Sequence, residues 1–206
     1  MKNFDTTLYF ITDSTGFSEE EFLSRVEQAL KGGVTLLQLR EKEKTTREYI
    51  ALAEKVHKLT QKYNIPLIID DRIDVAMAVN AEGVHLGQSD MPVDIARKIL
   101  GEDKIIGATA KTVPQALEAY ANGADNLGVG AIYPTTTKVK TVLTSVDTLK
   151  EIGAWIQDHP EEAADRRQMP SPRPEEWKPL LPTDRSVPAC QQDSLPNRTT
   201  ARAANS

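Results

Sequence analysis

Short apolar runs alternate with segments of helical periodicity from residue 8 to about residue 152 of this 206-residue chain. An apolar run of four to eight residues bounded by turn signals is typical of a strand. After the run at 34–39, Ile50, Val56 and Leu59 recur at the spacing of one helix face. Strands that alternate with helices in this way predict a parallel α/β sheet covered by helices.

Six strand–helix units are predicted. We expect the strands at 8–12, 34–39, 66–69, 83–87, 104–108 and 125–130. We expect helices at 18–32, 45–63, 72–80 and 113–122, and two more that begin at Pro92 and Ser145. Ser18 and Glu21 have the spacing of a capping box for the first helix. The pattern indicates an α/β fold of the (β/α)8 TIM-barrel type, incomplete because it has six βα units.

The composition changes after Ile152. Eight of the twelve prolines lie beyond position 159, and Gly153 is the last glycine of the chain. Closely spaced prolines prevent a continuous helix or a central strand. We therefore expect a partial, catalytic (β/α) barrel over residues 1–152 and a Pro-rich, irregular or disordered tail over residues 153–206.

Charge and cysteine content exclude several classes of protein. The formal charge of −5 and the absence of a basic stripe argue against a nucleic-acid-binding surface. No apolar run approaches the length of a membrane span, and the N-terminus lacks the apolar region of a signal peptide. Cys190 is the only cysteine, which excludes an intrachain disulfide. We expect a cytoplasmic protein that acts on small molecules.

Charged and hydroxyl residues directly follow five of the predicted strands. Because parallel strands end at the same edge of a sheet, these residues would meet at one rim. The set combines acidic metal ligands, cations and hydroxyls, which suits a magnesium-bound diphosphate and points to an enzyme. Its members are Arg40, Glu41 and Lys42, Asp70 and Asp71, Gln88, Ser89 and Asp90, Thr109 and Lys111, and Thr135, Thr136, Thr137 and Lys138.

Alternation along the second strand places Gln38, Arg40 and Lys42 on one side. Two cations and an amide donor there suit phosphate oxygens, with Arg offering a two-pronged contact. The structural alternative is a solvated charged surface, which fits Glu43 and Lys44 better than it fits Arg40.

Asp70 and Asp71 end the third strand and Asp90 follows the adjacent one, which makes them candidate ligands of Mg²⁺, since it prefers one or two carboxylates plus phosphate oxygens and water. Asp71 could instead cap a helix, and Asp90 could occupy a turn. Thr109 could bind substrate or cap the helix at 113. His85 is interpreted as a packed residue that faces the helices, because its parity is opposite to that of Gln88.

In the loop at 134–138, consecutive hydroxyls and amides can cradle a phosphate, and Lys138 can neutralise a leaving group. A threonine-rich turn without a ligand is the alternative.

Five of these segments, in their order, spacing and strand context, resemble the thiamine phosphate synthase family over residues 8–152. They are QLREK (38–42), DDR (70–72), GVHLGQSD (83–90), GATAKT (107–112) and GAIYPTTTK (130–138). The resemblance implies a (β/α)8 barrel that joins 4-amino-2-methyl-5-(diphosphooxymethyl)pyrimidine to a thiazole phosphate. The products would be thiamine phosphate and pyrophosphate.

The resemblance also implies roles for individual residues. Mg²⁺ would bind Asp71 and Asp90, and Arg40, Lys42 and Lys138 would carry catalysis. The thiazole phosphate would bind Thr135, Thr136 and Thr137. The pyrimidine diphosphate would contact Gln38, Leu39, Arg40, Glu41, Lys42, Asp70, Thr109 and Lys138.

Three features depart from the family pattern. Asp70 stands where asparagine is usual, Thr109 replaces a serine, and the glycine-rich phosphate loop near the end of the barrel is missing. Two other functions therefore stay open. One is a thiazole tautomerase-like relative, and the other is an inactive barrel fragment that binds a magnesium diphosphate or a partner chain.

Overall fold

The computed structural model describes residues 4–133 and 143–158. It contains a six-stranded parallel sheet in which each strand pairs with the next in the sequence, from β1 to β6. The strands are β1 (Tyr9–Ile11), β2 (Leu36–Leu39), β3 (Leu67–Asp70), β4 (Gly83–Leu86), β5 (Ile105–Ala110) and β6 (Asn126–Val129). The helices are α1 (Glu19–Lys31), α2 (Thr46–Lys62), α3 (Ile73–Val79), α4 (Val93–Leu100), α5 (Val113–Ala121) and α6 (Val146–Asp158).

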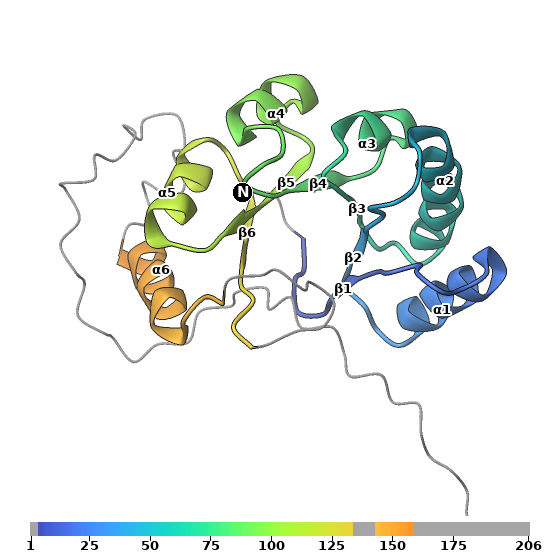
Figure 1. Cartoon of the computed structure of the whole chain (residues 1–206), viewed down its shortest axis with the longest axis horizontal. Helices are drawn as coiled ribbons and strands as arrows, with labels where there is room; N and C mark the ends of the chain where they lie inside the picture. Colours follow the sequence, from blue (N-terminus) through green and yellow to red (C-terminus); the bar gives the residue numbers. More distant parts are fainter. Residues whose placement is uncertain (1–3, 134–142, 159–206) are drawn as a thin grey trace, which may run out of the picture.

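The sheet curls, and the helices lie along its outer side (Figure 1). Within residues 4–133 and 143–158, β1 and β6 each pair with one strand only, so the curl is an incomplete barrel. The predicted α/β fold with six βα units is confirmed. A search of the same residues for a helix with the length and apolar character of a membrane span finds none.

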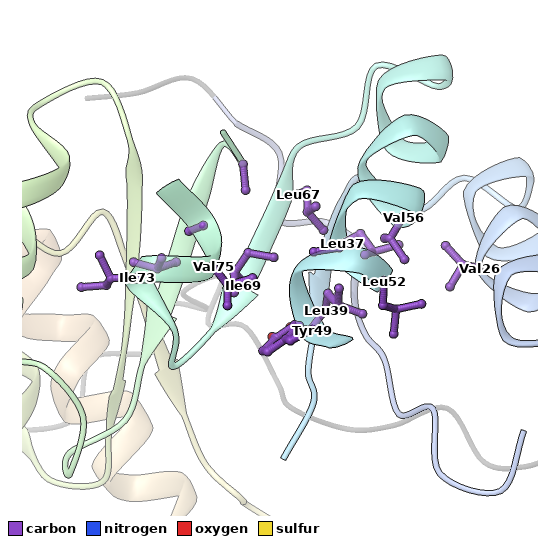
Figure 2. Packing of buried hydrophobic residues seen from close by; sticks show 14 of the residues in the cluster. Val26, Leu37, Leu39, Tyr49, Leu52, Val56, Leu67, Ile69, Ile73 and Val75 are labelled. Carbon is purple, nitrogen blue, oxygen red and sulfur yellow. The ribbon is translucent and has the colours of Figure 1, made fainter. Parts of the chain in front are cut away.

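Most of the apolar core lies between the sheet and the outer helices. Leu37 and Leu39 of β2 and Ile69 of β3 pack against Leu52 and Val56 of α2 (Figure 2), and all five are buried. The opposite side chains of these strands point into the barrel. A smaller cluster there, formed by Leu36, Ile68 and Ile105, fills its amino-terminal half.

A complete capping box forms at Thr45 and Glu48, at the start of α2. The two residues have the spacing of the motif, although only the helix was predicted there. The box predicted at Ser18 is half formed. The Ser18 hydroxyl accepts the Glu21 N–H at 3.2 Å, but the Glu21 carboxylate pairs with Arg25 one turn later. Ser18 is still the N-cap of α1, so the predicted helix start is correct.

The boundary predicted at residue 152 divides helix α6, which continues to Asp158. Residues 153–158 are helical because Ala154 is buried and Ile156 packs against the cluster that contains Ile152 and Val129. The prediction of irregular structure is therefore wrong for these six residues. The remainder of the predicted tail, 159–206, lies outside the described residues.

Candidate active site

Alternation along the strands separates a polar inner face from the apolar outer one at the carboxyl ends of β2 to β5. Leu39, Leu86 and Ala108 face the helices. The residues at the alternate positions of these strands and of β3, including Asp70 and His85, therefore face the barrel interior. The sheet register places Asp70 beside His85. This end of the sheet is where barrel enzymes carry their active sites.

Two cations meet a buried carboxylate at this rim. Lys42 Nζ lies 2.8 Å from Asp70 Oδ2 and also contacts the Asp71 carboxylate. Arg40 Nε lies 3.8 Å from the same Asp70 oxygen, an ion pair too long for a hydrogen bond. Arg40 Nε is buried and has no hydrogen-bond partner among the described residues. The rim thus holds a donor that a ligand oxygen could satisfy.

Burial disfavours the charged form of Lys42, but its hydrogen bonds to Asp70 and Asp71 outweigh that effect and raise its pKa. Burial raises the pKa of Asp70, and repulsion from Asp71 acts in the same direction, while Lys42 and Arg40 act against it. The Asp70 carboxyl is thus costly to ionise unless both cations stay close.

The other predicted residues of this strand divide between the two faces. Gln38 is buried on the inner face and donates to the Tyr9 hydroxyl at 2.7 Å. The Leu39 side chain packs among the helices, and its carbonyl accepts a hydrogen bond from Tyr49. Glu41 accepts from the Ser14 hydroxyl at 2.8 Å. The side chains of Leu39 and Glu41 therefore point away from the cation cluster.

Asp71 and Asp90 approach each other at the ends of neighbouring strands. Asp71 has a left-handed backbone (φ 62°), a conformation that costs energy for a residue other than glycine and often marks functional sites. The Asp90 carboxylate turns back to accept the Gly87 N–H at 2.7 Å. A Cβ atom on residue 87 would lie 2.8 Å from that carboxylate, so a larger residue there would require the Asp90 side chain to shift.

Burial raises the pKa of Asp90, the Gly87 N–H opposes the rise, and the neighbouring Asp71 carboxyl adds to it. A carboxylate whose ionisation is disfavoured by a neighbouring carboxyl fits a divalent cation, which would relieve the repulsion. No group of three or more His, Cys, Asp or Glu side chains suited to a metal occurs in the described residues. A cation held by Asp71 and Asp90 would therefore need ligand or water oxygens as well.

His85 is on the inner face, so the prediction that it packs against the helices is wrong. Its Nε2 lies 2.9 Å from the Thr109 hydroxyl, which it fixes at the rim. The prediction counted alternation back from Gln88, but β4 ends at Leu86 and the loop does not preserve the alternation. The Gln88 amide donates to the Thr109 carbonyl at 2.6 Å. Thr109 is therefore a rim residue, and Thr112 caps α5 instead.

Thr135, Thr136, Thr137 and Lys138 lie outside the described residues. Lys111 directly follows the last residue of β5. Its backbone N–H donates a hydrogen bond to the Gln115 side chain at 2.9 Å.

Comparison with known families agrees with this geometry. Residues 8–161 match the family model described as thiamine monophosphate synthase. The chain belongs to this family. A thiamine-phosphate synthase of Clostridium tetani is 52% identical over 73% of this chain and 72% of its own. One from Clostridium acetobutylicum is 54% identical over 74% of this chain and 72% of its own.

A solved structure supports the same family. A thiamine phosphate pyrophosphorylase from Pyrococcus furiosus superimposes with a TM-score of 0.63 at 39% identity, over 71% of this chain and 69% of that one. An N-acetylmannosamine-6-phosphate 2-epimerase from Clostridium perfringens gives a TM-score of 0.52 at 13% identity, over 78% of this chain and 81% of that one. This second likeness shows the fold alone. Membership in the thiamine monophosphate synthase family makes the chain a member of a transferase family.

Proposed function

We propose that the protein is a thiamine phosphate synthase that transfers the methylpyrimidine group from its diphosphate to a thiazole phosphate. The observation that carries the proposal is the cluster of Arg40, Lys42, Asp71 and Asp90 at one rim of the barrel. In a member of this family, cations beside paired carboxylates suit a diphosphate that binds with a divalent metal and then leaves.

Arg40 and Lys42 would bind the diphosphate oxygens. Lys42 now contacts Asp70 and Asp71, so it would have to exchange one of these carboxylates for a phosphate oxygen. Among the described residues the Arg40 Nε–H makes no hydrogen bond, only the longer ion pair with Asp70, so it would have less to give up. Charge-assisted hydrogen bonds to a phosphate are stronger than neutral ones, which favours both exchanges. Thr109, held by His85, would add a hydroxyl donor.

Asp71 and Asp90 would hold Mg²⁺, whose charge would assist departure of the pyrophosphate. In the reaction, the chain itself would position the two substrates and compensate the charge of the leaving pyrophosphate. The carbon–oxygen bond to the diphosphate would break, and the resulting cation would be stabilised by the aminopyrimidine ring. The thiazole nitrogen would then attack that carbon, so the two rings must be held in contact before the bond breaks.

Lys138 would stabilise the leaving pyrophosphate, and Thr135, Thr136 and Thr137 would bind the thiazole phosphate. These assignments rest on the family resemblance of the segment 130–138. They make the acceptor site a separate part of the proposal, which a binding experiment can test independently of the diphosphate site.

Formation of thiamine phosphate from the two substrates and Mg²⁺ by the purified full-length protein is the direct test. A protein that produces thiamine phosphate and pyrophosphate in equal amounts would support the proposal. Release of pyrophosphate without thiamine phosphate would show a working diphosphate site and a failed acceptor site.

The alternative function is a barrel that binds the magnesium diphosphate without coupling it. The open edges of β1 and β6 in the described residues are the observation that favours this alternative, because a closed barrel holds its rim loops together. Magnesium-dependent binding of the pyrimidine diphosphate without product would identify it. A thiazole tautomerase-like protein would instead act on the thiazole phosphate alone, and it would have no need of Arg40, Lys42 and the carboxylate pair.

A further inference from the structure

A polar layer lies one step below Thr109 on the inner face, and the family resemblance assigns only Asp70 among its residues. The sheet register aligns Asp70, His85, Gly107 and Asn126 on four successive strands. Ile106 and Ala108 on either side of Gly107, and Leu127 after Asn126, belong to the clusters on the helix side. Alternation therefore turns His85 and Asn126 into the barrel, one step below Thr109.

Gly107 makes room for these two side chains. A Cβ atom at position 107 would lie 2.5 Å from His85 Nδ1 and 2.9 Å from Asn126 Oδ1. The imidazole and the amide therefore reach over the same glycine from the strands on either side. Together they form a continuous polar floor beneath the site proposed for the diphosphate.

The amide of Asn126 is incompletely used within the protein. Its Nδ2 is buried and has no hydrogen-bond partner among the described residues. Gln38, the other amide on the inner face, donates to the Tyr9 hydroxyl at 2.7 Å. Buried polar groups in proteins are nearly always hydrogen-bonded, so an isolated amide donor that faces a binding site indicates a ligand acceptor.

The charge distribution determines which part of a ligand would reach this floor. The cations that would bind phosphate, Arg40 and Lys42, lie at the rim. The floor presents an amide and an imidazole instead, and Asp70 beside His85 would repel a phosphate. The part of the ligand that enters should therefore be uncharged and able to accept a hydrogen bond.

We propose that Asn126 recognises the aminopyrimidine ring of the diphosphate substrate, with His85 fixing the floor on which the ring lies. This inference rests on the proposed function. An amide offers an N–H donor beside a carbonyl acceptor, and an aminopyrimidine offers a ring nitrogen acceptor beside an amino donor. The same complementarity lets asparagine bind the amino edge of adenine through two hydrogen bonds. Asn126 is thus a specificity-determining residue for the ring, whereas the rim residues bind the diphosphate.

The test compares two ligands by titration calorimetry in the presence of Mg²⁺: the pyrimidine methyl diphosphate and inorganic pyrophosphate. Asn126→Leu, which has a similar size and no hydrogen-bonding group, and Asn126→Ala should each weaken binding of the pyrimidine diphosphate about tenfold or more. Both variants should leave pyrophosphate affinity within about twofold. In the coupling reaction, the KM for the pyrimidine diphosphate should rise while the KM for the thiazole phosphate stays unchanged. Asn122→Ala, at the C-cap of α5, is the matched control and should change neither affinity.

An equal loss of affinity for both ligands would assign Asn126 a merely structural role, and an unchanged affinity for both would also overturn the inference. If the wild type forms thiamine phosphate and either of these results is found, only the inference fails. If the wild type binds the pyrimidine diphosphate no more tightly than pyrophosphate and forms no thiamine phosphate, the proposed function fails as well.

Discussion

Both ends of the sheet carry charged side chains, but these make different kinds of contact. At the amino-terminal end, Glu82 accepts the Leu67 N–H and pairs with His57, and Lys104 donates to the carbonyl of Ala81. At the carboxyl-terminal end, Lys42 lies between two carboxylates and Arg40 Nε has no hydrogen-bond partner among the described residues. The bonds at the amino-terminal end connect neighbouring loops. At the carboxyl-terminal end, polar groups remain with which a ligand could form hydrogen bonds.

Arg97 shows how completely the amino-terminal end is bonded. Its guanidinium donates to the carbonyls of Gly101, Lys104 and Gly123 and pairs with Asp125 at 2.6 Å. Asp125 in turn accepts the Ile106 N–H, which joins the starts of β5 and β6. Stability should therefore depend on the charges at this end, and ligand binding on those at the other end.

The largest expected effect is on folding. Arg97→Leu should lower the free energy of unfolding by about 3–5 kcal/mol, because it leaves Asp125 and several carbonyls buried without their partner. Urea denaturation followed by circular dichroism measures the loss. Arg25→Leu is the control: Arg25 forms an exposed pair with Glu21, for which about 0.5 kcal/mol is expected. Similar losses for both variants would contradict the contrast between the two ends.

The next effect is on binding. Asp71→Asn or Asp90→Asn should weaken magnesium-dependent pyrophosphate binding tenfold or more, about 1.4 kcal/mol, because each removes a carboxylate of the proposed metal site. Neither substitution should lower the free energy of unfolding much, since the Asp71 carboxyl makes ionisation of Asp90 more costly and each substitution removes that repulsion. The control is Asp94→Asn, because Asp94 is an exposed residue of α4 that pairs with Lys98. Unchanged affinity would remove Asp71 and Asp90 from the metal site.

Asp70 should act in the opposite direction. Asp70→Asn should tighten pyrophosphate binding about fivefold, on the order of 1 kcal/mol, because it removes a negative charge beside the phosphate oxygens and releases Arg40 and Lys42. Titration calorimetry measures the change, and Asp74→Asn on α3 is the exposed control. Weaker binding would instead show that Asp70 holds the two cations in the position that the ligand needs.

The pH dependence of stability tests the ionisation of the Asp70 carboxyl group. Its pKa is raised above 3.8 in the folded protein by burial, so the folded state holds the proton more tightly than the unfolded state. That contribution to stability is complete below the unfolded pKa and is lost as pH rises through the folded pKa. The wild type should therefore lose stability relative to Asp70→Asn over that range in urea denaturation. A constant difference between the two proteins would show that Asp70 does not titrate there.

Periodicity was sufficient to predict the strands, the helices and the meeting of Arg40, Lys42, Asp71 and Asp90 at one rim. These features follow from local patterns and from the shared direction of parallel strands. Side-chain direction could not be predicted where a strand ends and a loop begins, so His85 was placed on the wrong face. Leu39 lies within a predicted binding segment, but alternation turns its side chain toward the helices.

Other features depend on contacts between distant segments. Asn126 lies within the predicted strand 125–130, and only the glycine at position 107 on the adjacent strand reveals the space its side chain occupies. Arg97 belongs to a helix with a charged face, and nothing local indicates that its guanidinium binds the loops before β5 and β6. Such bonds become visible only when the register of the sheet is known.

The smallest expected effect concerns the segment after α6. Ending the chain after Asp158 should leave the free energy of unfolding within about 0.5 kcal/mol, if the Pro-rich composition of 159–206 prevents close packing. Ending it after Ile152 should instead cost about 2 kcal/mol or more, because Ala154 and Ile156 no longer cover the outer side of β6. Urea denaturation of the two shortened chains separates these outcomes. A large loss on removing residues 159–206 would show that they pack against the barrel, and the contrast drawn between the two ends of the sheet would then need to include them.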